Sequence, residues 1–520
     1  MRTRGHRSEA LRIAIRSKRG RERTGAVDAL LGIDLGTTGC KAAVCSVKGE
    51  VLGTGYIEYP LISPRPEIVE QDANLWWSLT RQVAKQAIAD SGVDGRTVRA
   101  LGVSAQGISF VPVDRAGRAL RRAITWLDTR ASAEVATIRR RIADRELFQV
   151  TGKRPGAFYV LPKLLWLQRH EPRLYRNAHK FVMAHGYLLL QLCGTAVTDF
   201  TMASGSLLLD LWRLEWSDDL LTAFGIRREQ LPDLAQAGTV AGTLAVDVAR
   251  DLGLRSETLV VVGGQDQKCA ALGAGIRPGR ATVSLGTASA ISCLTGEPIL
   301  DPNRRIPAFP FVVPGYWDLE GVVSTSGAAL RWIRDTFFPT EEYAALMELA
   351  RQSPPGANGV RFYPHLAGAT SPIWRPEARG AFAGLSLAAR PADIVRSVLE
   401  GVAFQIRSNV DVMASMTPIG EIVLFGGGAR HPLWGELIAQ ATGKPVYVAK
   451  MSDVANWGAC VLAGVGAGLY KDDRILEVSQ GACWCSVPSP ERVRQYDDMY
   501  QVYREDERRR SLEDEQDGEE

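Results

Sequence analysis

Residues 31–44 read LGIDLGTTGCKAAV, and residues 281–291 read ATVSLGTASAI. In both stretches a Leu-Gly-Thr tripeptide lies between two short apolar runs, which is the pattern of a β-hairpin closed by a glycine turn. A third Leu-Gly-Thr, at residues 52–54, has no such surroundings. The two hairpins, one in each half of the chain, predict a duplicated fold whose halves grip a polyphosphate from both sides.

The segments that follow each hairpin repeat the same order of elements. In the first half we expect three strands, a helix capped by Asp72 and a further strand, at residues 30–35, 41–47, 51–59, 72–88 and 98–104. In the second half we expect three strands and a helix, at residues 282–285, 290–294, 316–323 and 327–338. Strands that alternate with helices in this way predict an α/β architecture.

The length of 520 residues is too great for one hydrophobic core, so several domains are expected. We expect four segments: a basic disordered extension, an N-terminal domain, a C-terminal domain and a charged helical tail, at residues 1–28, 29–277, 278–472 and 473–520. Hydrophobic residues make up 46% of the chain and charged residues 23%, as in an ordinary globular protein.

Charge is uneven along the chain. Residues 1–25 contain nine Lys or Arg and two Glu, whereas residues 504–520 contain four Arg and nine Asp or Glu. We interpret the basic head as a disordered extension, or as the result of a start codon assigned too early, and the acidic tail after Tyr503 as a frayed helix end. The net charge of +4 is too small to predict a nucleic-acid partner.

Neither a membrane partner nor a disulfide framework is predicted. No run reaches the roughly 18 apolar residues that a membrane span needs. The eight cysteines are scattered, and only Cys483 and Cys485 lie close together, without a surrounding His/Cys group. Reduced thiols and a cytoplasmic location are therefore expected.

The first glycine turn carries groups that suit a phosphate ligand. A phosphate needs several converging N–H donors, which a Cβ would obstruct, and Gly36, Thr37 and Thr38 offer free amides and two hydroxyls. The preceding carboxylate, Asp34, suits Mg²⁺, and Lys41 adds positive charge. An ordinary hairpin with a helpful glycine is the alternative interpretation.

The second half offers matching groups. Gly286 and Thr287 can meet the same triphosphate from the opposite wall, and three glycines at residues 426–428, after an apolar strand, can lie against a flat adenine. A plain strand-to-helix loop is the alternative for the three glycines. The chain has no G-x-x-x-x-G-K-[ST] and no proper G-x-G-x-x-G, which disfavours a P-loop or a Rossmann site.

Asp266 is the candidate catalytic residue. It comes after an apolar run that ends in two glycines, Val261-Val262-Gly263-Gly264, and after Gln265, so it is expected at the mouth of a buried strand, within reach of a cleft. Phosphoryl transfer to an alcohol needs a base near the attacking hydroxyl, while positioning and charge neutralisation supply most of the rate. An aspartate that caps the helix beginning near Gln267 is the alternative.

Taken together, these segments resemble the FGGY carbohydrate kinases, most closely their xylulokinase-like branch, from about residue 29 to residue 470. The segments that carry the resemblance are Gly32–Thr38, Glu70–Asp72 with Trp76-Trp77, Ser104–Gly107, Trp126–Arg130, Thr198-Asp199 with Ala203-Ser204, Gly263–Gln267, Gly286-Thr287, Gly380–Leu385, Glu400-Gly401, and Gly426–Arg430 with Pro432–Trp434. Each is modest alone, but their shared order and spacing are specific.

The resemblance implies two ribonuclease-H-like domains of the actin/hexokinase type with an interdomain cleft. It implies ATP and Mg²⁺ as cofactors, with a sugar on the N-terminal domain and the nucleotide mostly on the C-terminal domain. It also implies Asp266 as general base and Asp34 as metal ligand. The remaining implied contacts are Gly36, Thr37, Thr38, Lys41, Gly286 and Thr287 to phosphates, Gly427, Gly428 and Ala429 to adenosine, and Gln106, Gly107, Trp126, Asp128, Arg130 and Gln267 to the sugar.

Two departures from the family pattern bear on the substrate. Gly107-Ile108-Ser109 follows Gln106, where familiar xylulokinases have Met-His-Gly after the Gln, and Gln267 replaces their Asn after the base. Phosphorylation of D-xylulose to D-xylulose 5-phosphate is the leading prediction, with another ketose, polyol or sugar acid as the alternative. An actin- or chaperone-like signalling ATPase is the alternative of a different class, and a homodimer is possible.

Overall fold

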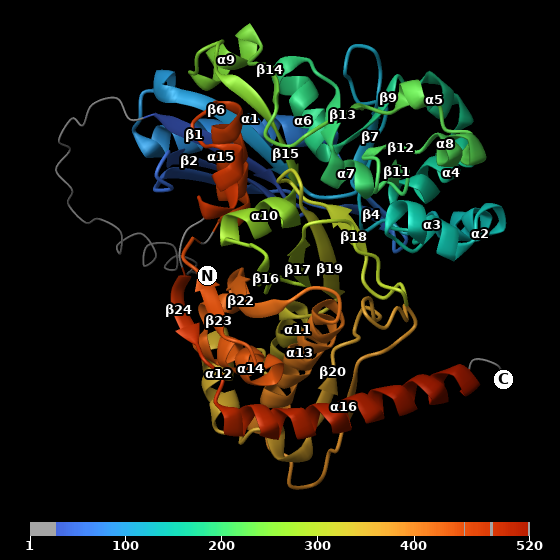
Figure 1. Cartoon of the computed structure of the whole chain (residues 1–520), viewed down its shortest axis with the longest axis vertical. Coiled ribbons are helices and arrows are strands. Elements are labelled where there is room, and N and C mark those ends of the chain that lie inside the picture. Colours follow the sequence, from blue (N-terminus) through green and yellow to red (C-terminus); the bar gives the residue numbers. More distant parts are fainter. Residues whose placement is uncertain (1–27, 452, 479–481, 518–520) are drawn as a thin grey trace, which may run out of the picture.

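The computed structural model describes residues 28–451, 453–478 and 482–517, and two large sheets dominate it (Figure 1). The first sheet has the strand order β14 (Val240–Thr243), β15 (Leu259–Gln265), β6 (Val98–Ala105), β1 (Ala29–Leu35), β2 (Gly39–Ser46) and β3 (Val51–Glu58). The second has the order β18 (Ala308–Pro310), β19 (Trp317–Val323), β17 (Ser289–Thr295), β16 (Gly279–Ser284), β22 (Ile419–Phe425), β23 (Val446–Ala449) and β24 (Ala482–Ser486).

The two sheets share one topology. Strands β1, β2 and β3 form an antiparallel meander, and β6 and then β15 add in parallel on the other side of β1. Strands β16, β17 and β19 repeat the meander, and β22 and then β23 add in parallel on the other side of β16. The duplicated α/β fold predicted from the two hairpins is therefore confirmed.

Helices cover the first sheet because its glycines let them approach closely. Helix α1 (Ala73–Ser91) begins at Asp72, whose side chain accepts a hydrogen bond from the amide of Asn74, as the sequence predicted. Helix α15 (Val454–Gly466) packs against β1, β6 and β15. A Cβ on Gly32 of β1 would lie 2.2 Å from the carbonyl oxygen of Asn456, so only glycine fits there.

The two halves meet where α10 (Asp266–Ala274) crosses α15. A Cβ on Gly458 of α15 would lie 1.9 Å from the carbonyl oxygen of Cys269, and a Cβ on Gly273 of α10 would lie 2.0 Å from that of Val454. The helix that follows the first sheet also packs, through Ala270 and its neighbours, against the second sheet. Each half thus contributes one helix to a close crossing at the junction.

A large insertion extends the first half between β6 and β15. Its main sheet also takes in two strands that precede β6, and the strand order is β4 (Ile62–Arg65), β5 (Ile68–Gln71), β8 (Ala123–Ile124), β7 (Phe110–Val113) and β9 (Lys180–Met183). Two small sheets pair β10 (Val197–Asp199) with β13 (Asp233–Ala235) and β11 (Leu209–Asp210) with β12 (Glu215–Trp216). Its helices are α2 (Ser132–Arg141), α3 (Asp144–Thr151), α4 (Val160–His170), α5 (Pro172–Asn177), α6 (Ala184–Cys193), α7 (Phe200–Ser204) and α8 (Asp218–Phe224), and α9 (Val246–Leu252) follows.

The second half adds helices and a small hairpin around its sheet. These elements are α11 (Gly327–Phe337), α12 (Tyr343–Arg351), β20 (Arg361–Tyr363), β21 (Ala381–Ala383), α13 (Pro391–Ala414) and α14 (Pro432–Thr442). A cavity of about 160 Å³ lies between α13, the last helix of the chain and the loop before β20, and its lining includes Phe362, Phe404 and Val502.

The acidic end of the chain is not frayed at the point expected. Helix α16 (Pro490–Asp517) runs along the lower side of the molecule in Figure 1 and continues past Tyr503. Arg361 Nε donates to Asp506 Oδ2 at 2.9 Å, and Gln405 Nε2 donates to Glu507 Oε1 at 2.6 Å. The expectation of fraying directly after Tyr503 is wrong, because these carboxylates find partners in the second half.

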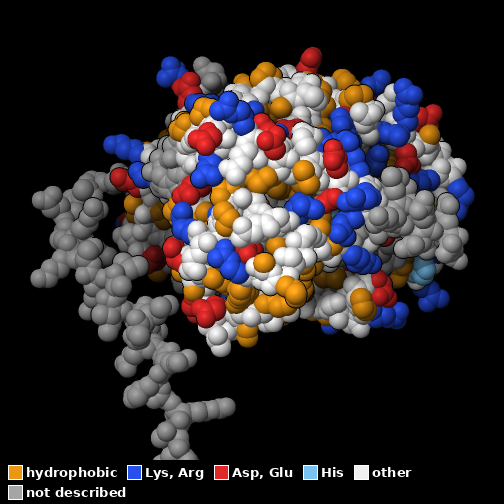
Figure 2. All heavy atoms as spheres, turned by 90° about the horizontal axis from the view of Figure 1, so that it is seen from below, with side chains coloured by type: hydrophobic (Ala, Val, Ile, Leu, Met, Phe, Trp, Pro, Cys, Tyr) orange, Lys and Arg blue, Asp and Glu red, His pale blue; other side chains and the backbone are white. Residues whose placement is uncertain are grey.

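The surface and the chain ends add three observations. On the face seen from below, Lys and Arg side chains are interspersed with acidic and hydrophobic ones (Figure 2). Within the ranges that the structure describes, no helix is long and apolar enough to cross a membrane. The basic head at residues 1–25 lies outside the described residues, and the four predicted segment boundaries stay predictions.

Candidate active site

The first glycine turn joins β1 to β2 and holds Asp34 beside it. The amide of Gly36 donates to the carbonyl of Gly39 at 3.0 Å, which closes the turn, and Thr38 is exposed. Asp34 pairs with Lys41 on β2 and with Ser104 on β6, and Ser104 Oγ donates to Asp34 Oδ1 at 2.8 Å. Burial raises the pKa of Asp34, while Ser104 and Lys41 lower it.

Asp266 is the first residue of α10, at the end of strand β15. One carboxylate oxygen, Oδ1, accepts a hydrogen bond from the amide of Gln267 at 2.8 Å. Burial, followed by the charge of Asp34 from the first sheet and that of Glu320 from the second, raises the pKa of Asp266 to about 7. The carboxylate therefore lies between the two halves and next to the first glycine turn, which makes it more than a helix-capping residue.

The second glycine turn and the run of three glycines come together. The amide of Gly428 donates to the carbonyl of Leu285 at 2.9 Å, directly before the turn at Gly286 and Thr287. Both residues of the turn are exposed, and their carbonyls accept hydrogen bonds from the first amides of α11. Gly427 faces open space, whereas Ala429 is buried. The structure thus brings the predicted second phosphate loop next to the three glycines, while the predicted adenosine contact Ala429 lies below the surface.

Gln106 is the centre of a hydrogen-bond network behind the first turn. Its Nε2 donates to Gln71 Oε1 at 2.8 Å, and its Oε1 accepts from Ser109 Oγ at 3.0 Å. The indole Nε1 of Trp126 donates to Thr37 Oγ1 at 2.8 Å. The fully buried Gln106, which also accepts from Thr37 Oγ1 at 3.4 Å, and the partly exposed Trp126 are therefore both linked to the first glycine turn.

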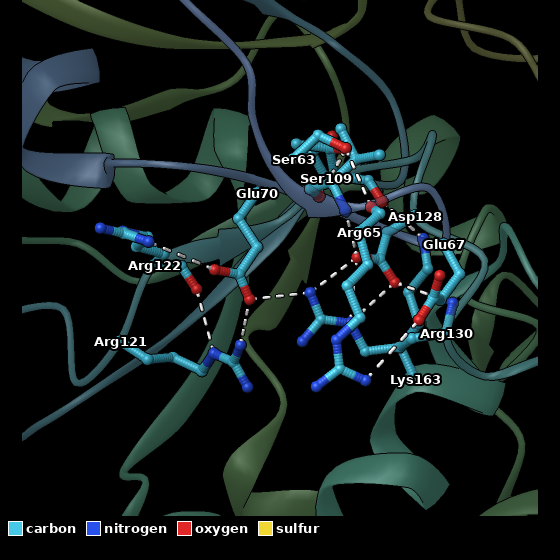
Figure 3. Close-up of polar contacts among 12 residues, drawn as sticks. Ser63, Arg65, Glu67, Glu70, Ser109, Arg121, Arg122, Asp128, Arg130 and Lys163 are labelled. Carbon is cyan, nitrogen blue, oxygen red and sulfur yellow. Dashed lines mark hydrogen bonds and ion pairs between the residues drawn. The ribbon is translucent and has the colours of Figure 1, made fainter.

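Asp128 and Arg130 hold the loop that carries Trp126. Arg130 donates to both oxygens of the buried Asp128, at 2.8 and 2.9 Å from Nε, and its Nη2 also reaches Glu70 Oε1 at 2.7 Å. Asp128 Oδ2 also accepts from the amide of Val69 at 2.7 Å. Figure 3 shows Glu70 between Arg121 on one side and Arg130 on the other. Because their polar atoms bind protein groups here, the predicted sugar contacts of Asp128 and Arg130 stay predictions.

Lys41 contacts the second half of the chain rather than the turn it follows. Its Nζ donates to Asp453 Oδ1 at 3.0 Å, at the start of α15, and lies 5.6 Å from the centroid of the Tyr56 ring. Both partners of the ion pair are partly exposed. The pair links the halves near Asp34, and a contact of Lys41 with phosphate stays a prediction.

A buried ion cluster joins the halves directly behind Asp266. Lys268, two residues further along α10, donates to Glu320 Oε2 at 2.7 Å and also to Asp318, both on β19. All three side chains are buried. Burial raises the pKa of Asp318 to about 7, although Lys268 opposes the effect. The cluster fixes the first turn of α10 to the second sheet.

Several residues of the site were missed by sequence reasoning. Tyr59 donates from its hydroxyl to the carbonyl of Gly36, and its pKa is raised by burial first and then by nearby acidic groups that include Asp34 and Asp266. Lys268 had a visible signal, since a lysine within an otherwise apolar helix needs a buried counter-charge. Asp318 and Glu320 had another, since two carboxylates at alternate positions of an apolar strand lie on one face.

Two lobes of one topology, each with a glycine turn, and a carboxylate at their junction are typical of a phosphotransferase of the actin/hexokinase type. The chain belongs to the FGGY family of carbohydrate kinases. The profile of that family's N-terminal domain matches residues 29–273, and the profile of its C-terminal domain matches residues 281–467. The protein is therefore a carbohydrate kinase, and the predicted fold class is confirmed.

Three relatives show the range of activities close to this chain. The xylulose kinase of Escherichia coli K12 is 32% identical over 444 residues, covering 85% of this chain and 90% of its own. The ligand-bound xylulose kinase from Lactobacillus acidophilus superposes with a TM-score of 0.87 at 27% identity, covering 92% and 97%. The gluconate kinase from the same organism also gives 0.87, at 26% identity and with the same coverage. The chain is thus similar to kinases named for two different substrates.

Proposed function

We propose that this carbohydrate kinase transfers the γ-phosphoryl group of ATP to D-xylulose, giving D-xylulose 5-phosphate, with Asp266 as general base. The single observation that carries the mechanism is a carboxylate whose pKa is raised to about 7 at the junction of the two halves. A base with a pKa near the working pH can accept a proton efficiently and release it again. The similarity to named xylulose kinases supports the choice of sugar.

The side chains divide the work as follows. Asp266 Oδ1 is held by the amide of Gln267, so its other oxygen is available to accept the proton of the attacking sugar hydroxyl. Thr38 and Thr287 are exposed in the two glycine turns, and backbone amides of these turns would bind the phosphates, where they offset the charge that builds on the transferring group. Closure of the halves around the sugar would exclude water and so suppress ATP hydrolysis.

The environment of Asp34 fits the divalent cation that this family's chemistry implies. The charge of Asp34 contributes to the raised pKa of Asp266, and a cation held by Asp34 would weaken that repulsion. Ser104 occupies Oδ1 of Asp34, which leaves Oδ2 without a partner among the described residues. When bound, Mg²⁺ would neutralise charge on the phosphate oxygens.

The competing activity with an observation in its favour is a sugar-acid kinase. It is supported by the similarity to the gluconate kinase of Lactobacillus acidophilus. The signalling ATPase loses its basis, since the chain belongs to a family of carbohydrate kinases. A cytoplasmic location and a homodimer stay predictions.

An ADP-release assay with ATP and Mg²⁺ tests the proposal across D-xylulose, other ketopentoses, pentitols, glycerol and hexonates. We expect the highest kcat/KM with D-xylulose. Preference for a hexonate would transfer the proposal to sugar acids. No turnover above background hydrolysis with any of these compounds would refute it.

A further inference from the structure

Gln265, the residue directly before Asp266, has a buried side chain that the proposed mechanism does not use. It is 7% exposed and ends strand β15, where it pairs with Ala105 of β6. Its amide N–H donates to Thr201 Oγ1 at 2.9 Å, which fixes its backbone. The register places Gln265 beside the loop that begins at Gln106.

The side chain of Gln265 occupies the space that a larger residue at position 107 would fill. A Cβ on Gly107 would lie 2.4 Å from Gln265 Nε2 and 2.9 Å from its Cγ and Cδ. Gly107 therefore admits the Gln265 amide into the region between the Gln106 loop and Asp266. These two positions are complementary, and together they shape the wall next to the proposed base.

The amide of Gln265 lacks the partner that burial requires. Its Oε1 is buried and has no hydrogen-bond partner among the described residues, and the same is true of Oε1 of Gln267. An unpaired buried carbonyl is costly, and rotation of the amide would only exchange an unpaired acceptor for an unpaired donor. The residues directly before and after Asp266 thus each have an amide oxygen without a donor, and a ligand hydroxyl would supply the donor that Gln265 lacks.

We propose that Gln265 binds the sugar hydroxyl adjacent to the one that Asp266 deprotonates. The inference rests on the proposed function and narrows it to substrates with a vicinal diol at the phosphorylated end. A site built to hydrogen-bond a hydroxyl discriminates strongly against an analogue without it, because the buried polar group is then left unpaired. Gln265 is thus a specificity-determining residue as well as a binding residue.

The variant Gln265→Met tests this, because methionine has nearly the same length and no amide. With the sugar that the wild type prefers, we expect KM to rise about 10-fold while KM for ATP stays unchanged. The second substrate is an analogue of this sugar without the hydroxyl next to the phosphorylated position. For the wild type, kcat/KM with this analogue should be about 10- to 100-fold lower than with the parent sugar. For Gln265→Met, the same comparison should give a loss of less than about 3-fold. Gln191→Met is the matched control. Gln191 lies on α6, within the insertion, and its side chain donates to the carbonyl of Gly117. This variant should change neither the KM for the sugar nor the KM for ATP.

The outcomes separate this inference from the proposed function. Absence of turnover by the wild type with every sugar would refute the proposed function itself. Turnover by the wild type with unchanged sugar KM and unchanged discrimination in Gln265→Met would overturn the role of Gln265 alone. If Gln265→Met does not fold, the wild type alone still tests the inference. Equal kcat/KM of the wild type for the parent sugar and for every analogue deoxygenated next to the phosphorylated position would overturn it.

Discussion

Replacement of Asp266 by asparagine should make the protein more stable and nearly inactive. Burial is the largest cause of the raised pKa of Asp266, followed by the charge of Asp34. Both effects penalise the charged carboxylate in the folded state. Asparagine has nearly the same shape and carries no charge, so Asp266→Asn removes the penalty together with the proposed base.

The magnitude follows from the pKa shift. The folded-state pKa rises from 3.8 to about 7, and each unit corresponds to 1.36 kcal/mol, so the charged form costs up to about 4 kcal/mol. Between pH 4 and 7 the folded state holds a proton that the unfolded state has lost, so wild-type stability falls as pH rises through this range. The advantage of Asp266→Asn should therefore be about 2 kcal/mol at pH 5 and about 4 kcal/mol at pH 8.

Urea unfolding of the wild type and the variant at pH 5 and pH 8 measures this difference. Asp498→Asn, at an exposed position on α16, is the control and should show no pH-dependent gain. In the ADP-release assay, Asp266→Asn should bind ATP nearly as the wild type does and lose phosphoryl transfer by a factor of about 10³ or more. An equal effect on stability at both pH values would refute the desolvation argument, and full turnover would remove Asp266 from its proposed role.

Three further predictions concern the junction and the chain ends. Lys268→Met should lower the free energy of unfolding in urea by about 3–5 kcal/mol, because two buried carboxylates lose their counter-charge. The control Lys85→Met breaks an exposed pair with Asp251 and should cost less than about 1 kcal/mol. Similar losses in both variants would contradict the argument. Gly458→Ala should force α10 and α15 apart and lower the midpoint of thermal unfolding. The control Gly296→Ala, whose Cβ would point into open space, should have little effect. An unchanged midpoint for Gly458→Ala would mean that the helix crossing can relax. Removal of residues 1–25 should leave kcat and both KM values within about twofold, and a large loss would show that the basic head contributes to activity.

How much the sequence could predict depended on the distance between the residues that interact. The hairpins, the helix at Asp72 and the position of Asp266 depend on neighbours in the chain, and their patterns were visible. The contact of Gln265 with Gly107 and that of Lys268 with Glu320 join segments more than 50 residues apart, and no local period encodes them. The continuation of α16 past Tyr503 was missed for the same reason, because Asp506 is held by an arginine on β20.

The close crossing of α10 and α15 has a consequence for movement. Two helices whose backbones are in direct contact cannot slide past one another, but they can rotate about the point of contact. The crossing is therefore expected to be the hinge about which the two lobes rotate. Residues near a hinge move least, and Asp266 lies in the first turn of α10, one of the two helices that form it. Asp266, the proposed base, would then move little when the two lobes rotate. The parts of each lobe far from the crossing would move furthest, and their movement would admit and release the sugar.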